Sequence, residues 1–571
     1  MRPQSHPLRL GIWVTLLVVA SAVLALQQVL IGSQLNPDGT SYMDLADAYL
    51  RLDWRAAVGA YWSPLYPALI AAWFSIIRPS NLQELTAIHG LNCLLFLGVD
   101  LLFLYLAQAL GKRDSPSGHT LLLTLAAGAA VWSGVGAIGV TLVSPDLLVS
   151  GLVVAIAILL LSVSDRTLTN RGAAVFGAVL GMAYLTKFSL LPVACASLFM
   201  AFLTARSDRP TLLKLCRTLM IFALIAGVWT GLMSFRVRRL TMGDVGKLSY
   251  AWYVGGIRPF AHWMGEPAES GRPAHALELI SSEPQLFFFG DTYPHSTYPL
   301  WYDASHWYEG LRISFDVSRQ MSATCAAIVS FFIAIGDLAP LFAVVLVLIL
   351  FAGADPEGLA GRWRRVWPLA GMAVFGIAMY LLVHVESRFI GGFVALFVIA
   401  LVWWVLESPR LLFVSSCVLL STVCFLVPAA MRMHGDWRKI RVDGIEDPAV
   451  VAETIASLGV PPEARIAHFN DSFPSLGWAR LAHLHIVADM PAGDFERFLL
   501  LPKERQLQLL RELRARKVDF VFAHLGRRHM ELAAPKFRAT GGLRWQLVDS
   551  SGLAMLALRT DRAGLGRRSA I

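Results

Sequence analysis

Long apolar runs, separated by short polar segments, dominate the first 430 residues of the chain. The first run, Leu10–Ile31, has 22 residues without a break. A helix of that length spans the apolar core of a bilayer, because each residue adds about 1.5 Å. We therefore predict an all-α polytopic membrane domain with about eleven transmembrane helices. The ten further runs are Glu84–Leu110, Thr120–Val140, Pro145–Val163, Gly172–Tyr184, Phe188–Thr204, Leu219–Phe235, Ala323–Phe351, Val366–Val383, Phe389–Leu406 and Leu411–Ala430.

Two of these runs leave alternatives open. Leu10–Ile31 follows a basic start, and Val23-Leu24-Ala25 within it resembles a signal-peptide cleavage site, but the unbroken length favours an uncleaved helix. Ala323–Phe351 is interrupted by Gly336-Asp337 and by Pro340, so it is either a broken helix or a surface helix followed by one span. Counting one span here keeps every basic loop on the same side of the membrane.

Lys and Arg residues gather in alternate connections between the runs, for example at Gly111-Lys112-Arg113 and at Arg362-Trp363-Arg364-Arg365. Such segments stay in the cytoplasm, which places the N-terminus inside and the C-terminal region outside. This pattern accounts for the net charge of +9 without a nucleic-acid-binding face. Only 16% of the residues are charged, against roughly 25% in soluble domains. The six cysteines lie in or beside apolar runs, so no disulfide framework is indicated.

Three polar regions lie on the predicted outer side. They are loops 32–83 and 236–320 of a transmembrane domain 1–430, and a C-terminal region 431–571. The C-terminal region alternates strand and helix patterns, which is typical of a small soluble α/β domain. No Gly-rich loop opens a helix there, so no nucleotide site is predicted. The strand patterns are Ala464–Phe469, His485–Asp489, Val518–His524, Trp545–Val548 and Leu553–Leu558, and the helix patterns are Pro448–Leu458, Leu476–His483 and Asp494–Lys517.

Two acidic residues lie at the outer ends of predicted helices. Asp38 follows the first run and is bracketed by Pro37 and Gly39, and Asp146 follows Ser144-Pro145 at the start of another run. A carboxylate fixed beside the membrane suits a general base toward an acceptor hydroxyl or amine. The alternative, which local sequence favours at both positions, is a helix N-cap or an acid at the positive end of a helix dipole.

Two cations lie at helix junctions on the same side. Lys187 separates two apolar runs and either snorkels to the surface or binds an anionic headgroup. The segment His384-Val385-Glu386-Ser387-Arg388 holds either an internal ion pair or a phosphate-binding arginine that Glu386 orients. An acid and two cations at one membrane face fit chemistry on a phosphate-bearing lipid.

The motifs resemble those of GT-C-fold glycosyltransferases, in the group around protein O-mannosyltransferases and aminoarabinose transferases. The resemblance lies in the order of the motifs along the chain and in the side of the membrane on which they are predicted. The resemblance covers roughly Leu10 to Leu406. It rests on Asp38-Gly39 with Tyr42, Ser63-Pro64-Leu65-Tyr66-Pro67, Ser144-Pro145-Asp146-Leu147, Leu185-Thr186-Lys187 and Glu386-Ser387-Arg388-Phe389.

The resemblance implies a polyprenyl-phosphate-linked sugar donor and gives Asp38 the catalytic role. Substrate binding would fall on Tyr42, Asp146, Lys187, His384, Glu386 and Arg388. Many relatives carry two adjacent acids where this chain has Asp38-Gly39, which disfavours a divalent metal cofactor. Some relatives carry a lysine where Pro64 stands, so Lys187 and Arg388 are expected to hold the phosphate instead.

We therefore expect an inverting, metal-independent hexosyl- or pentosyltransferase in a bacterial inner membrane, acting at the periplasmic face. The acceptor is a lipid, a glycan or a protein, and the aromatic loop 236–320 either packs over the sugar or anchors at the membrane interface. A transporter or flippase is the alternative and predicts polar residues along a path through the bilayer. A non-catalytic scaffold is the third hypothesis.

Overall fold

The structure is a computed structural model. It describes residues 7–31, 35–111, 116–258, 262–351, 356–405, 411–442, 447–471, 476–524, 545–548 and 553–558.

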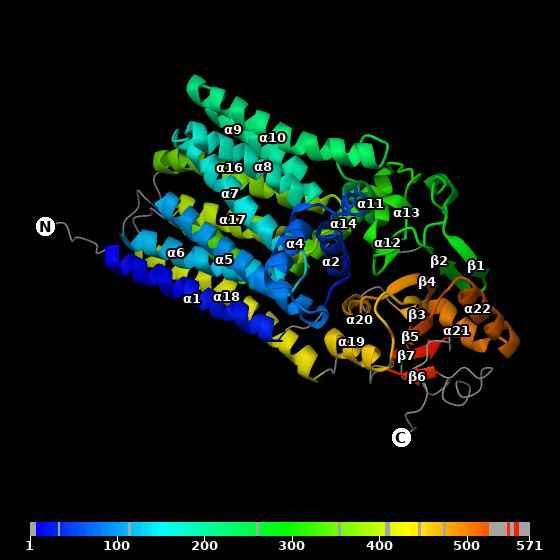
Figure 1. The fold of residues 1–571 in the computed structure, drawn as a ribbon. Helices are drawn as coiled ribbons and strands as arrows, with labels where there is room; N and C mark the ends of the chain where they lie inside the picture. The colour runs from blue at the N-terminus through cyan, green and yellow to red at the C-terminus, as the bar shows by residue number, and fades with distance from the viewer. Residues whose placement is uncertain are drawn as a thin grey trace.

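A bundle of long helices forms one half of the molecule, and a sheet lies beyond one end of it (Figure 1). Each of the eleven predicted runs coincides with one helix or with two or three consecutive helical segments. Seven helical segments among the described residues are long and apolar enough to cross a membrane, which confirms a multi-pass membrane protein. The helices are α1 (Pro7–Ile31), α5 (Glu84–Gly111), α6 (Pro116–Val131) with a π-helical extension η2 (Trp132–Ile138), α7 (Asp146–Ser164), α8 (Asn170–Thr186), α9 (Leu191–Ala205), α10 (Arg209–Arg236), α14 (Val317–Ala334), α15 (Ala339–Phe351), α16 (Pro356–Leu381), α17 (Ser387–Val405) and α18 (Leu411–Val442).

The ambiguous run 323–351 is a broken helix that crosses the bundle once. α14 and α15 are joined by the 3₁₀ turn η5 (Gly336–Leu338). The Gln320 side chain, in the first turn of α14, donates to the Leu382 carbonyl at the C-terminal end of α16 (2.8 Å). The chain then enters α16 at its other end, so α14 and α15 together connect the two faces.

Basic residues of α10 and α16 lie at one end of the bundle. Arg365 pairs with Asp165 (2.7 Å), Arg362 donates to the Trp403 carbonyl, and Lys214 donates to the Leu168 carbonyl, all at the end away from the sheet. We call this the basic end and the opposite one the sheet end. Among the described residues, Lys214, Arg362 and Arg365 thus share one end of the bundle.

Short elements from the two loops cover the sheet end. The first loop forms α2 (Pro37–Leu50), α3 (Trp54–Ala57), α4 (Leu65–Ile77) and η1 (Asn81–Gln83). The second loop forms α11 (Val245–Tyr253), η4 (Ala268–Ser270), α12 (Pro299–Tyr302), α13 (Ala304–Trp307) and the strands β1 (Glu278–Ser282) and β2 (Gln285–Phe288). The aromatic side chains of this loop pack together with residues of the C-terminal region in one apolar cluster.

The seven-stranded sheet has the order β1-β2-β4-β3-β5-β7-β6. Its centre is parallel, and β2 of the second loop pairs antiparallel with β4, so the loop and the C-terminal region build one sheet. All five predicted strands form, and β6 and β7 pair as the expected antiparallel hairpin. The strands are β3 (Arg465–Asp471), β4 (His485–Pro491), β5 (Phe520–His524), β6 (Trp545–Leu547) and β7 (Leu553–Ala557).

The C-terminal helices differ from the predicted pattern at one point. The single helix expected over Asp494–Lys517 is wrong, because α21 (Ala492–Leu500) and α22 (Lys503–Ala515) are separate. Leu501 precedes Pro502 and takes an extended conformation (φ −62°, ψ 151°), as the proline ring requires of its neighbour. The other helices are α19 (Pro448–Ser457) and α20 (Gly477–Leu481).

A buried arginine joins the C-terminal region to the first loop. Arg480 of α20 is 1% exposed and lies within 3.1 Å of carboxylate oxygens of Asp44, Asp47 and Glu84. Asp44 and Asp47 belong to α2, and Glu84 begins α5. A guanidinium out of water needs such partners, because an unpaired buried charge costs several kcal/mol. The contact therefore fixes α2 against the C-terminal region.

We expect Arg480→Ala to destabilise the protein by about 3–5 kcal/mol, because it leaves three carboxylates crowded without their cation. Thermal unfolding of the purified protein in detergent measures this. Arg505→Ala is the matched control, since Arg505 is an exposed arginine that bonds the side chain of Gln508. Equal unfolding temperatures for the two variants would contradict the role of Arg480.

Candidate active site

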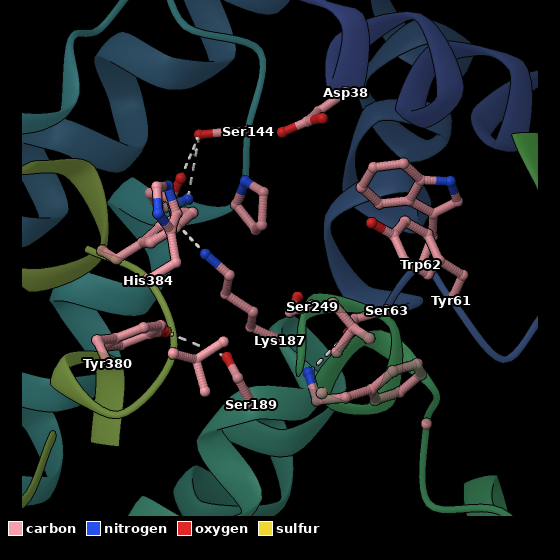
Figure 2. Close-up of a pocket in the computed structure, with 18 of the residues that line it drawn as sticks. Asp38, Tyr61, Trp62, Ser63, Ser144, Lys187, Ser189, Ser249, Tyr380 and His384 are labelled. Atoms are coloured by element: carbon pink, nitrogen blue, oxygen red, sulfur yellow. Dashed lines mark hydrogen bonds and ion pairs between the residues drawn. The ribbon is translucent and has the colours of Figure 1, made fainter. Parts of the chain in front are cut away.

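A cavity of about 470 Å³ opens at the sheet end of the bundle. Its walls come from both loops and from the ends of several bundle helices. Figure 2 shows Tyr61 and Trp62 on one side, His384 and Tyr380 on the other, and Lys187 between them. The predicted site residues Asp38, Tyr42, Asp146, Lys187, His384, Glu386 and Arg388 all line it. The structure thus brings every candidate of the sequence analysis into one cavity.

Asp38 lies in the first turn of α2, after Pro37. Asn36 holds the N-cap position, so Asp38 is not the cap. Its Oδ1 accepts from Trp301 Nε1 (3.3 Å) and its Oδ2 from Arg388 Nη1 (3.0 Å). The Asn36 side chain instead makes two hydrogen bonds to the backbone of Val143, which joins the start of α2 to the loop before α7.

Asp146 is the first residue of α7 and is almost completely buried, at 1% exposed. The residue at the N-cap position is Pro145, so Asp146 is not a cap either. Its Oδ1 accepts from Lys187 Nζ (2.7 Å) and its Oδ2 from Ser144 Oγ (3.0 Å). Asp38, by contrast, has 23% of its side chain exposed, so a bound molecule can reach Asp38 but not Asp146.

Lys187 lies between α8 and α9, and its backbone conformation is extended (φ −154°, ψ 116°). Its ammonium pairs with Asp146 and lies 4.0 Å from the centre of the Phe389 ring. The next backbone N–H, that of Phe188, donates to Ser63 Oγ of the first loop (2.9 Å). The lysine is therefore held inside the cavity and does not snorkel to the surface.

Arg388 joins the charged groups. Its Nε donates to Glu386 Oε2 (2.6 Å) and its Nη1 donates to Asp38, with Asp146 Oδ2 at 3.8 Å. His384 lies 3.3 Å from the other Glu386 oxygen and stacks on the Tyr253 ring at 4.0 Å. The predicted local ion pair of this segment therefore forms, and Arg388 points toward Asp38.

The carboxyl of Glu386 is strongly acidic. Burial alone would raise its pKa, but the hydrogen bond from His384 and the charge of Arg388 outweigh burial and lower the pKa to about 2. Glu386 is therefore ionised at neutral pH. With Asp38 and Asp146 it forms a network in which three carboxylates contact the two cations Lys187 and Arg388.

Tyr42 supports the wall behind Asp38. It is buried and packs edge-on against Trp62 (4.9 Å) and Tyr66 (5.3 Å). Burial, with the nearby charge of Asp38, raises the pKa of its hydroxyl well above the usual value. Tyr42 is thus a neutral aromatic wall residue.

Sequence reasoning missed part of this wall. Tyr61 and Trp62 directly precede the Ser63-Pro64 motif, and that adjacency was the one available signal. Trp62 Nε1 donates to the Trp301 carbonyl (2.9 Å), which holds the two loops together above Asp38. Trp252, Tyr253 and Trp301 of the second loop also line the cavity.

The chain has the fold of the GT-C membrane glycosyltransferases, which confirms at the level of fold the resemblance drawn from the motifs. The apo structure of ArnT from Cupriavidus metallidurans has 12% sequence identity and a TM-score of 0.53, covering 97% of this chain and 99% of that one. The oligosaccharyltransferase of Archaeoglobus fulgidus, in complex with Zn and sulfate, has 13% identity and a TM-score of 0.50, covering 95% and 73%.

A second structure of ArnT, bound to undecaprenyl phosphate, has 14% identity and covers 97% and 99% of the two chains, but its TM-score of 0.41 adds nothing to the fold assignment. No family model and no curated protein matches the sequence.

We expect Glu386 to stabilise the fold in a pH-dependent way. Its pKa is lower in the folded protein (about 2) than the ordinary value of 4.5, so its contribution is present above pH 4.5 and is lost as the pH falls toward 2. The difference in unfolding temperature between wild type and Glu386→Gln should stay constant from about pH 7 to 5 and shrink below. Glu357→Gln is the control, because Glu357 is an exposed residue at the basic end of the bundle. A difference that widened on acidification would contradict the assignment.

Proposed function

We propose that the protein is a glycosyltransferase that moves a sugar from a polyprenyl monophosphate carrier to an acceptor. The observation that carries this is one cavity in which an accessible carboxylate, Asp38, contacts Arg388 and which Lys187 also lines. A base for the acceptor and cations for the leaving phosphate are the two groups that such a transfer needs. The GT-C fold supports the proposal.

In the proposed reaction, Asp38 accepts the proton of an acceptor hydroxyl or amine. The acceptor atom then forms a bond to the anomeric carbon of the sugar, and the bond from that carbon to the phosphate oxygen breaks. Its electron pair leaves with the polyprenyl phosphate, whose negative charge Lys187 and Arg388 stabilise. A single displacement of this kind inverts the anomeric configuration.

Arg388 has the donors for this role. Its Nε and Nη1 are bound to Glu386 and Asp38, while Nη2 makes no hydrogen bond to any residue that the structure describes. A guanidinium offers five N–H donors in a plane and binds phosphate through two of them at once. Arg388 therefore keeps Asp38 oriented and retains donors for the phosphate.

Two kinds of apolar side chain line the cavity. Leu191, Met379, Val383 and Phe389 come from the ends of bundle helices, and the aromatic rings of Tyr61, Trp62, Trp252 and Trp301 come from the two loops. Aromatic rings suit the apolar faces of a sugar. We place the prenyl chain along the bundle side chains and the sugar against the aromatic rings.

We further propose that the transfer needs no metal. Gly39 stands where relatives carry a second acid, and a Cβ there would lie 2.7 Å from both Leu35 and Val143. Packing therefore excludes an acid at position 39. The remaining carboxylates, Asp38, Asp146 and Glu386, are each already paired with Lys187 or Arg388, so the chain itself supplies cations at the site.

The location of the site favours transfer over transport. The candidate residues gather at the sheet end of the bundle, whereas a transporter is expected to bind its substrate near the bilayer midplane. Because basic segments stay in the cytoplasm, we place the basic end there and the sheet end in the periplasm of a bacterial inner membrane.

We expect Asp38→Asn to lower transfer by about 10²–10⁴-fold, because the amide cannot accept the proton. Release of labelled sugar from a polyprenyl-phosphate donor in membranes measures it. Asp53→Asn in the same loop is the control, since Asp53 caps α3 through a hydrogen bond that asparagine also makes. Full turnover by Asp38→Asn would refute the base assignment.

We expect Lys187→Met to weaken binding of polyprenyl phosphate by roughly 10–100-fold, since a hydrogen bond to a charged group contributes about 1.5–3 kcal/mol. The shift in unfolding temperature on adding the lipid reports the binding. Lys214→Met, at the basic end, should bind like wild type. Wild-type protein that gains no stability from the lipid would contradict the proposed donor.

A further inference from the structure

Three potential metal ligands converge outside the cavity, where the second loop meets the sheet. They are His295 in the loop before α12, Glu463 before β3 and His485 at the start of β4. Their nitrogen and oxygen atoms all lie within 4.8 Å of one another. The mechanism proposed above uses none of these residues.

Backbone hydrogen bonds fix the three segments relative to one another. The Glu463 N–H donates to the His483 carbonyl (2.7 Å) and the His485 N–H to the Ala464 carbonyl (3.0 Å). The Ile486 N–H donates to the Thr297 carbonyl (3.0 Å), two residues after His295. The convergence therefore follows from the backbone and does not depend on the rotamers of exposed side chains alone.

The hydrogen bonds of His485 leave a lone pair facing the carboxylate. His485 Nδ1 lies 2.7 Å from the Ser296 carbonyl oxygen, which can only accept, so Nδ1 carries the hydrogen. Nε2 of the neutral ring is then an acceptor, yet it lies 2.5 Å from a Glu463 oxygen, which is also an acceptor. Two acceptors at this distance need a cation between them, either a second proton or a metal ion.

The third ligand and the spacing favour a metal ion. His295 Nδ1 lies 3.8 Å from the same Glu463 oxygen, too far for a hydrogen bond. Tetrahedral zinc, with bonds of about 2.0–2.2 Å, separates its ligand atoms by roughly 3.3–3.5 Å, between the two observed separations. A backbone carbonyl on the far nitrogen of a histidine is also the usual partner of a zinc ligand.

We propose that His295, Glu463 and His485 bind a zinc-type divalent ion, with water completing the coordination. The ion would join the second loop to the sheet. Thr297, just beyond His295, donates through its N–H and its hydroxyl to Asp44 of α2, and Trp301 lies above Asp38. The site thus has a structural role at the roof of the cavity, and it does not depend on the proposed transferase activity.

Metal analysis of the full-length, untagged protein in detergent tests the proposal. After equilibration with Zn²⁺ and removal of free ion, wild type should retain about one zinc per chain. His295→Ala and Glu463→Gln should retain less than about a fifth of that. His275→Ala is the matched control, because His275 pairs with Glu309 in another partly exposed histidine–carboxylate contact of the same loop, and it should bind like wild type.

Thermal unfolding gives a second measurement on the same proteins. Zn²⁺ should raise the unfolding temperature of wild type and of His275→Ala, a chelator should reverse the rise, and His295→Ala should show no rise. His295 is half exposed, so this variant should fold even if His485→Ala does not. Wild type without stoichiometric zinc, or His295→Ala with as much zinc as wild type, would overturn the proposal.

Discussion

Charges beside a membrane must be paired, and the network of Lys187, Asp146, Arg388, Asp38 and Glu386 satisfies that requirement with partners from distant parts of the chain. Each member comes from the end of a helix or from the connection before it. A charge removed from water is costly unless it is paired, and each cation of the network therefore lies against carboxylates. The same pairing that joins α2, α7, α17 and the α8–α9 junction also leaves Asp38 within reach of a ligand.

Two pairings between carboxylates and arginines hold α2 in place. Its first turn carries Asp38, which Arg388 of the bundle holds. Its later turns carry Asp44 and Asp47, which Arg480 of the C-terminal region holds. The helix is thereby fixed at both ends by guanidinium groups from opposite sides, and the aromatic contacts of Tyr42 fill the space between them. The position of the proposed base is accordingly set by both halves of the molecule.

The sequence predicted the helices and the cavity residues well, for a physical reason. Apolar length and basic connections are local signals, and a charge such as Lys187 between apolar runs is unusual enough to be noticed alone. Long-range pairings leave no local signal. Nothing near Gln285–Phe288 indicates that this segment pairs with β4, and nothing in Arg480 shows that three carboxylates surround it. The Asp38 and Asp146 carboxylates resembled N-caps because only the folded chain reveals the cations that they bind.

The shared sheet has a consequence for how the protein is made. The first loop and most of the bundle leave the ribosome and enter the membrane long before residues 477–491 exist. Until those residues arrive, β2 has no neighbouring strand in β4 and the two aspartates of α2 have no guanidinium. The contacts that hold α2 and the second loop in place are therefore completed only after nearly the whole chain has been translated. A truncated product would carry every bundle helix and every residue that lines the cavity, but it would lack the guanidinium and the strand that fix the walls.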